Sequence, residues 1–231
     1  VPGFNHAIFD RSNSILPGLI EGLWQARDQA KREQNQPLSQ AIKIIMNSFY
    51  GVLGSNVCRF YDQRLSSSIT LRGHEILTRT KTCIEEQFNH TVIYGDTDSV
   101  FVWLGDDYPE EQADVRGREL QDYLNVWWQQ ELKERFDLPC YLELEYETHY
   151  SRFLMPRMRH SEKGSKKRYA GLQCLSGGKT RMVFKGLENV RTDWTALARD
   201  LQQELYERIF REQPWRALLK ERVAAVKAGE L

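Results

Sequence analysis

A chain of 231 residues, 41% of them apolar and 11% aromatic, can bury a substantial core, which excludes an intrinsically disordered segment. No window approaches the roughly 18 consecutive apolar residues of a membrane span, and the N-terminal residues lack the layout of a signal peptide, so we expect a soluble intracellular protein. The 32 basic and 32 acidic residues cancel but are segregated, because residues 105–147 hold 13 acidic and four basic residues whereas residues 157–191 hold ten basic and two acidic ones.

The N-terminal third favours helices. Residues 15–34 place apolar side chains on one stripe, and "NQP" separates them from a second helix over residues 38–53, so the two should form an antiparallel helical hairpin. A third helix is predicted over about residues 66–87. Residues 91–104 read as a two-stranded hairpin with "GDTD" at the turn, followed by a helix over residues 109–136.

The remainder alternates between turn signals and apolar stretches. We predict strands for "YLELEYE", "YSRFLM", "KKRYAGLQCL" and "TRMVFKGLE", then helices from residue 193, with Pro214 opening a further helix. The fold class is therefore α+β, with an antiparallel sheet that carries helices.

The cysteines and the chain ends limit other interpretations. Because the cysteines are widely separated and form no CxxC pair, the sequence indicates neither a zinc site nor a dense disulfide framework, and we expect reduced structural thiols at Cys58, Cys83, Cys140 and Cys174. The chain begins without methionine and ends inside a helical pattern, which predicts a piece of a longer protein.

Two carboxylates, Asp96 and Asp98, occupy the predicted hairpin turn one residue apart. Close carboxylates repel unless a cation lies between them, and hard oxygen ligands suit Mg²⁺, as in two-metal phosphoryl or nucleotidyl transfer. The alternative is a polar turn with exposed aspartates. An EF-hand loop is excluded, because its sixth position, counted from Asp96, would be Phe101 instead of the required glycine.

Cations gather on the helical hairpin. Arg27 and Lys31 share one face of the first helix, and Lys43, Asn47 and Tyr50 share one face of the second. Together they offer cations for a triphosphate and a flat ring for a base or sugar. Taken singly, a lysine or arginine on a helix is usually only part of a solvated face.

The combination of motifs resembles the family B DNA polymerases. "KIIMNSFYG" at residues 43–51 is similar to motif B of that family, and "YGDTD" at residues 94–98 is similar to motif C. "KKRYAGL" at residues 166–172 resembles the Lys-x-Tyr motif that grips the primer terminus, and "FKGLENVRTDW" at residues 184–194 resembles the segment that leads into the thumb. The resemblance covers nearly the whole chain.

The resemblance implies a role for each matching residue. Asp98 would bind both catalytic Mg²⁺ ions of the complete enzyme, with Asp96 beside them, Glu145 as a further metal-site carboxylate and Glu143 as its weaker neighbour. Lys43 would take part in catalysis, and the incoming nucleotide would be bound by Arg27, Lys31, Lys43, Asn47 and Tyr50. The basic-rich residues 157–191 would bind the DNA backbone without reading its sequence, through Lys166, Lys167, Arg168, Tyr169, Lys185 and Arg191. The alternative for Lys167 and Tyr169 is a strand with solvated lysines.

The resemblance also implies an organisation and partners. Residues 1–55 would form a two-helix fingers hairpin, residues 56–188 most of an antiparallel palm with the catalytic hairpin, and residues 189–231 the helical start of a thumb. The partners would be primer-template DNA, deoxynucleoside triphosphates and, through parts outside this chain, a sliding clamp, in the bacterial cytoplasm at the nucleoid.

One expected motif is missing. The aspartate of motif A, with its Ser-Leu-Tyr-Pro-Ser-like run, has no match here, so we expect the isolated chain to be inactive. Two alternatives remain open at this stage: a non-catalytic DNA-binding module of the same fold, and a metal-dependent nuclease, which would not need Lys43, Asn47 and Tyr50 on one helix face.

Overall fold

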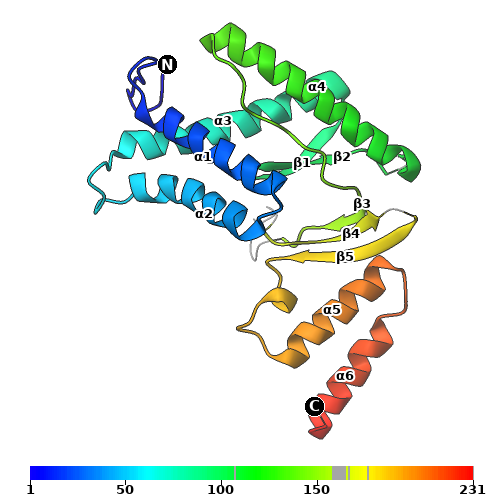
Figure 1. Cartoon of the computed structure of the whole chain (residues 1–231). Helices are drawn as coiled ribbons and strands as arrows, with labels where there is room; N and C mark the ends of the chain where they lie inside the picture. Colours follow the sequence, from blue (N-terminus) through cyan, green and yellow to red (C-terminus); the bar gives the residue numbers. More distant parts are fainter. Residues whose placement is uncertain (107, 158–164, 166, 176, 231) are drawn as a thin grey trace. The chain divides into compact units, whose positions relative to one another are not determined.

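The helices and strands confirm the α+β class (Figure 1). The computed structural model describes residues 1–106, 108–157, 165, 167–175 and 177–230. The chain folds as two units, Val1–Val102 with Leu132–Leu138 and Trp103–Glu131 with Pro139–Leu231. Within the described residues its elements are α1 Ile15–Arg32, α2 Gln36–Leu53, α3 Gln63–Phe88, β1 Thr91–Asp96, β2 Ser99–Trp103, α4 Glu110–Phe136, β3 Tyr150–Leu154, β4 Tyr169–Leu175, β5 Lys179–Lys185, the short 3-10 helix η1 Glu188–Val190, α5 Ala196–Phe210 and α6 Arg216–Ala228.

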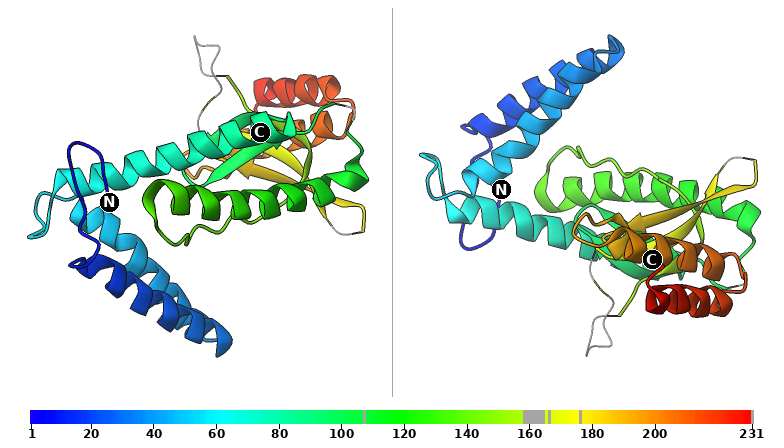
Figure 2. Two further views of the ribbon diagram at one scale, coloured as in Figure 1. Left: turned by 90° about the horizontal axis from the view of Figure 1, so that it is seen from above. Right: turned by 90° about the horizontal axis from the view of Figure 1, so that it is seen from below.

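The first unit begins with the predicted helical hairpin. In both views of Figure 2, α1 and α2 lie side by side, and Ala30 and Ile42 are buried. The chain reverses at Gln34, whose φ of 56° is left-handed, and Asn35 then caps α2 by accepting a hydrogen bond from the backbone N–H of Leu38 at 3.2 Å. A short polar reversal thus separates the two helices, as the "NQP" stretch predicts.

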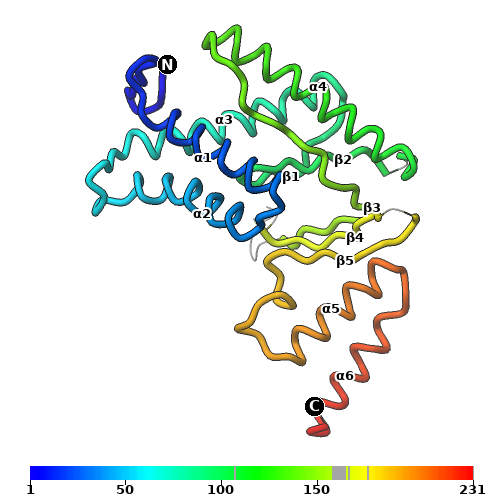
Figure 3. The backbone as a smooth tube through the Cα atoms, viewed as in Figure 1, coloured from blue at the N-terminus to red at the C-terminus, as the bar shows by residue number. Residues whose placement is uncertain are grey.

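The third helix leads directly into the β-hairpin, as the tube in Figure 3 shows. α3 starts three residues before its predicted start because Asp62 caps it, accepting from the backbone N–H of Arg64 at 2.8 Å. It ends at Asn89, which adopts the left-handed conformation common after helices. Ile84 and Val92 are buried where α3 packs with β1, so the helix fixes the base of the hairpin.

The second unit is built around an antiparallel sheet of order β3-β4-β5. The register pairs Gly171 with Phe153 and Val183, and the buried side chains under the sheet belong to β4, the segment after β5 and α5. The Tyr206 ring of α5 lies 5.9 Å from the Phe184 ring of β5, measured between centroids. α6 follows α5 and is joined to it by an ion pair from Arg222 to Glu204 at 3.4 Å. The C-terminal helices predicted from residue 193 are confirmed.

One predicted strand is wrong. Residues 141–147, "YLELEYE", form no strand but run along α4. The side chain of Asn125 makes both hydrogen bonds to the backbone of Leu144, accepting from its N–H at 2.8 Å and donating to its carbonyl at 2.9 Å, and Gln121 accepts from the backbone N–H of Tyr146 at 2.7 Å. Because helix side chains satisfy these backbone groups, no neighbouring strand is needed.

Candidate functional site

The β-hairpin presents its two aspartates from a single tight turn. Asp96 ends β1, Ser99 starts β2, and the backbone N–H of Asp98 donates to the carbonyl of Asp96 at 2.5 Å. This bond spans two residues and closes a γ-turn centred on Thr97, whose φ is 49°. Asp96 is half-buried and Asp98 is exposed. The hairpin is confirmed at the predicted place, with two carboxylates leaving one turn.

Thr97, which the sequence did not single out, holds the turn. Its hydroxyl donates to Oδ1 of Asp96 at 3.1 Å, and the Ser99 hydroxyl donates to the Asp96 carbonyl at 3.4 Å. A β-branched residue with positive φ costs on the order of 1–3 kcal/mol, so the surrounding hairpin must impose this conformation. The rings of Tyr94 and Phe101, whose centroids are 5.5 Å apart, pack across the two strands behind the turn.

On α2, Lys43, Asn47 and Tyr50 are all exposed at the spacing predicted to place them on one face. Tyr50 has a partner that the sequence did not indicate, since its hydroxyl lies 2.7 Å from Oγ1 of Thr70 on α3. This contact fixes the direction of the phenol, while Lys43 and Asn47 remain solvent-accessible.

On α1, the two predicted cations have different surroundings. Lys31 is exposed and forms an ion pair with Asp28 of the preceding turn at 3.7 Å. Arg27 is half-buried, and its Nε atom is buried without a hydrogen-bond acceptor among the described atoms.

The carboxylates predicted to join the aspartates, Glu145 and Glu143, are exposed and belong to the second unit. They flank Leu144, whose backbone is fixed by Asn125 of α4. Asp96 belongs to the first unit, so a shared metal site for the three carboxylates stays a prediction.

The predicted primer-gripping segment surrounds the start of β4. Lys166 lies outside the described residues, and Lys167 is exposed with a left-handed φ of 62°. Tyr169 pairs in register with Lys185 of β5, so their backbones lie directly opposite each other. Lys167 and Lys185 are exposed, and Tyr169 is half-buried. The strand begins only at Tyr169, because the left-handed φ of Lys167 is incompatible with a strand.

Two predicted DNA-binding arginines have acidic partners nearby. Arg168 forms an ion pair with Glu188, and Arg191 forms one with Asp193 at 2.5 Å. Burial of Glu188 opposes its ionisation, but hydrogen bonds from Gln202 and Arg168 outweigh that effect and lower its pKa. The pKa of Asp193 is lowered mainly by its hydrogen bonds from Arg191. Contact of either arginine with a phosphate would compete with these carboxylates.

Comparison with known proteins agrees with the motifs. The model of DNA polymerase family B matches residues 9–230. The chain is 56% identical over 229 residues to DNA polymerase II of Escherichia coli (strain K12), covering 99% of this chain and 29% of that protein. It is 31% identical over 203 residues to the DNA polymerase alpha catalytic subunit of Oryza sativa subsp. japonica, covering 83% of this chain and 12% of that protein. The chain therefore belongs to DNA polymerase family B.

More distant relatives extend the similarity. A DNA polymerase of Thermococcus gorgonarius is 29% identical over 222 residues, which cover 91% of this chain and 26% of that protein. The chain thus spans less than a third of the length of each of these relatives. Among the described residues, no helix combines the length and apolar character that crossing a membrane requires.

Proposed function

We propose that the chain is part of a template-directed DNA polymerase that adds deoxynucleotides to a primer 3′ end. The observation that carries the proposal is the γ-turn at the tip of the β1–β2 hairpin, which presents Asp96 and Asp98 together in a chain of family B. In the reaction the primer 3′ hydroxyl attacks the α-phosphate of the nucleotide, the bond to the β-phosphate breaks, and pyrophosphate leaves.

The donor set of the hairpin tip fits Mg²⁺. Both side chains offer hard carboxylate oxygens, and Asp98 is exposed, so phosphate oxygens and water can complete an octahedral shell. Asp98 would bind both ions of the complete enzyme, Asp96 would lie beside them, and Glu145 would add a further carboxylate. Bound there, Mg²⁺ would neutralise the charge that develops during phosphoryl transfer. Within the chain itself, the Thr97 hydroxyl orients the Asp96 carboxylate.

The helical hairpin supplies the proposed nucleotide-binding surface. Lys43, together with Arg27 and Lys31, would bind the β- and γ-phosphates and thereby stabilise the pyrophosphate that leaves. Asn47 and Tyr50 would line the nascent base pair, and the hydrogen bond of Tyr50 to Thr70 supports a fixed ring position. In this proposal residues 1–55 form the fingers, residues 56–188 most of the palm and residues 189–231 the start of the thumb.

The proposed DNA contacts fall on the second unit. Lys167, Tyr169 and Lys185 would contact the primer backbone near its end, and Arg168 and Arg191 would contribute only where a phosphate displaces their acidic partners. Such binding weakens steeply with salt. Because a bacterial polymerase is among the relatives, we place the whole protein at the nucleoid in a bacterial cytoplasm, where a sliding clamp would contact other parts of it.

Primer extension by full-length variants tests the proposal. Asp98→Asn in the protein that carries this chain should lower extension at least ~100-fold, because several kcal/mol of charge stabilisation are lost, while primer-template affinity stays within about twofold. Asp122→Asn, on an exposed position of α4, is the matched control and should extend normally. Undiminished extension by Asp98→Asn would remove this residue from the metal site.

Two further measurements separate the rival functions. The full-length protein, with any proofreading exonuclease inactivated, should leave labelled duplex intact when nucleotides are absent, since degradation that depends on Asp98 would indicate a nuclease. The isolated chain should bind duplex weakly and show no appreciable synthesis, because the motif A aspartate is missing. Robust extension by these 231 residues would show that motif A is dispensable.

A further inference from the structure

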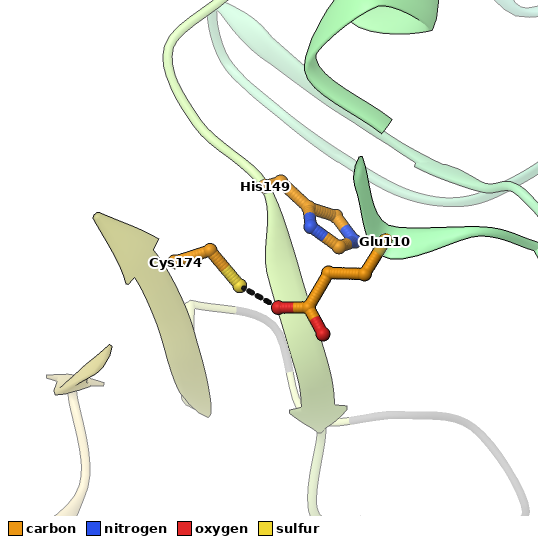
Figure 4. A group of neighbouring side chains, drawn as sticks. All are labelled: Glu110, His149 and Cys174. Atoms are coloured by element: carbon orange, nitrogen blue, oxygen red, sulfur yellow. Dashed lines mark hydrogen bonds between the residues drawn. The ribbon is translucent and has the colours of Figure 1, made fainter. Parts of the chain in front are cut away.

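Three potential metal ligands that belong to none of the quoted motifs converge in the second unit. Glu110 opens α4, His149 immediately precedes β3, and Cys174 lies near the end of β4. Their ligand atoms all lie within 4.8 Å of one another, and Figure 4 shows the three side chains pointing toward a common point from separate segments. Sequence spacing did not reveal this group, because its members are 39 and 25 residues apart, counted from 110 to 149 and from 149 to 174.

The backbone fixes two of the three positions. The N–H of Cys174 donates to the carbonyl of His149 at 2.9 Å, so these residues are neighbours before any ligand arrives. The thiol of Cys174 then donates to Oε1 of Glu110 at 2.8 Å. His149 and Cys174 are half-buried, and Glu110 is exposed to solvent.

A cleft beside the group provides room for an additional ligand. It has a volume of about 540 Å³, and Cys174 is part of its wall together with Thr148 and Gln173. The amide of Gln173 donates to the hydroxyl of Thr148 at 3.0 Å, so this wall is polar and ordered by its own hydrogen bonds. A water molecule can therefore reach the side of Cys174 that faces the cleft.

We propose that Glu110, His149 and Cys174 bind a zinc-type divalent cation. Thiolate, imidazole and carboxylate are the ligands that Zn²⁺ uses, and three protein ligands with an open fourth position are a common arrangement for it. The ion replaces the thiol proton that now lies between Cys174 and Glu110, and that proton is released to solvent. Zinc ligands lie roughly 3.5 Å from one another around the ion. Ligand atoms that are now up to 4.8 Å apart would therefore move closer, whereas Sγ of Cys174 and Oε1 of Glu110, now 2.8 Å apart, would separate slightly.

The bound ion joins the start of α4 to β4 and to the segment before β3. The ion thus cross-links three segments of the second unit. This site differs from the Mg²⁺ site proposed for the hairpin, because Mg²⁺ prefers an all-oxygen octahedral shell and binds a thiolate poorly. Because the ion binds the folded protein, adding it is expected to raise the melting temperature of the protein by mass action.

Cobalt(II) spectroscopy on the full-length protein tests the site. Co²⁺ added to the metal-free protein should give a thiolate-to-cobalt charge-transfer band, which one equivalent of Zn²⁺ removes and a large excess of Mg²⁺ does not. Cys174→Ser should abolish that band, and Glu110→Gln should weaken Zn²⁺ binding by at least roughly tenfold. Cys140→Ser, a half-buried cysteine of the same unit, is the matched control and should leave the band unchanged.

The outcomes are distinguishable from a folding defect. Far-ultraviolet circular dichroism of Cys174→Ser should match that of the parent, and Zn²⁺ should raise the melting temperature of the parent and of Cys140→Ser but not of Cys174→Ser. A cobalt band that persists in Cys174→Ser, or a parent that binds no Zn²⁺, overturns the proposal. Should Cys174→Ser fail to fold, the tenfold weakening by Glu110→Gln decides the matter.

Discussion

Two glycines in the middle of helices allow a sharp test of how the segment with Glu145 is held. A Cβ atom at Gly117 of α4 would lie 2.3 to 2.7 Å from ring atoms of Tyr146, whereas one at Gly73 of α3 meets nothing within 4 Å. Replacing a helical glycine by alanine gains about 1 kcal/mol from helix propensity at either site. At Gly117 the aromatic ring must also move, which costs roughly 1–3 kcal/mol for overpacking.

The loss at this site is larger than the steric term alone. The hydroxyl of Tyr146 donates to Oδ1 of Asp114 at 2.5 Å, and displacing the ring breaks this bond at a further cost of about 1–2 kcal/mol. Gly117→Ala should therefore destabilise the chain by about 1–4 kcal/mol in total, while Gly73→Ala should stabilise it by up to about 1 kcal/mol. A change of this size moves the melting temperature by about 2–4 °C per kcal/mol.

Urea unfolding of the two variants beside the parent provides the measurement. The test depends on the signs of the two changes in the free energy of unfolding, which should be opposite whatever the absolute stability of the parent. Proton NMR or ultraviolet titration of the Tyr146 phenol adds a local readout, because burial and the hydrogen bond to Asp114 raise its pKa in the parent. If Gly117→Ala stabilises the protein as much as Gly73→Ala, the packing of Tyr146 on α4 is not as described.

Two further changes test other contacts. Asn125→Ala removes both hydrogen bonds to the backbone of Leu144 and should cost about 2 kcal/mol and speed amide exchange there, whereas Gln130→Ala on the exposed face should change stability by at most about 0.5 kcal/mol. Because folding lowers the pKa of Glu188 through Gln202 and Arg168, its contribution is complete above the unfolded value of about 4.3 and is lost as pH falls through the folded pKa. Urea unfolding over this acid range should therefore show a shallower loss of stability for Glu188→Gln than for the parent.

Local signals in the sequence predicted most of the fold. The helices over residues 15–34 and 38–53 and the hairpin over residues 91–104 depend on periodicity, caps and turn residues that lie within or next to each element. The strand predicted for residues 141–147 was wrong because its backbone partners, the amides of Gln121 and Asn125, lie about 20 residues earlier on a helix. Alternation of apolar residues does not show whether the backbone hydrogen-bond partners of a segment lie on a neighbouring strand or on a helix.

The same difference between local and distant partners applies to the candidate site. The sequence identified Asp96 and Asp98 because a tight turn brings neighbouring residues together whatever surrounds it. It did not identify the acidic partners of Arg168 and Arg191, because a cation on a predicted strand or loop does not reveal which carboxylate lies beside it. Lys167 and Lys185 remain exposed, as a solvated strand and a DNA contact would both require.

The carboxylates of the proposed metal site are thus held by different means. The conformation of the β1–β2 turn is determined within a few residues, by the positive φ of Thr97 and its hydroxyl bond to Asp96. Glu145 owes its position to α4, through the bonds that Gln121 and Asn125 make to the residues on either side of it. Substitution of Gln121 or Asn125 should therefore displace Glu145 while leaving the turn intact, because the bonds that define the turn join Asp96 to Asp98, Thr97 and Ser99.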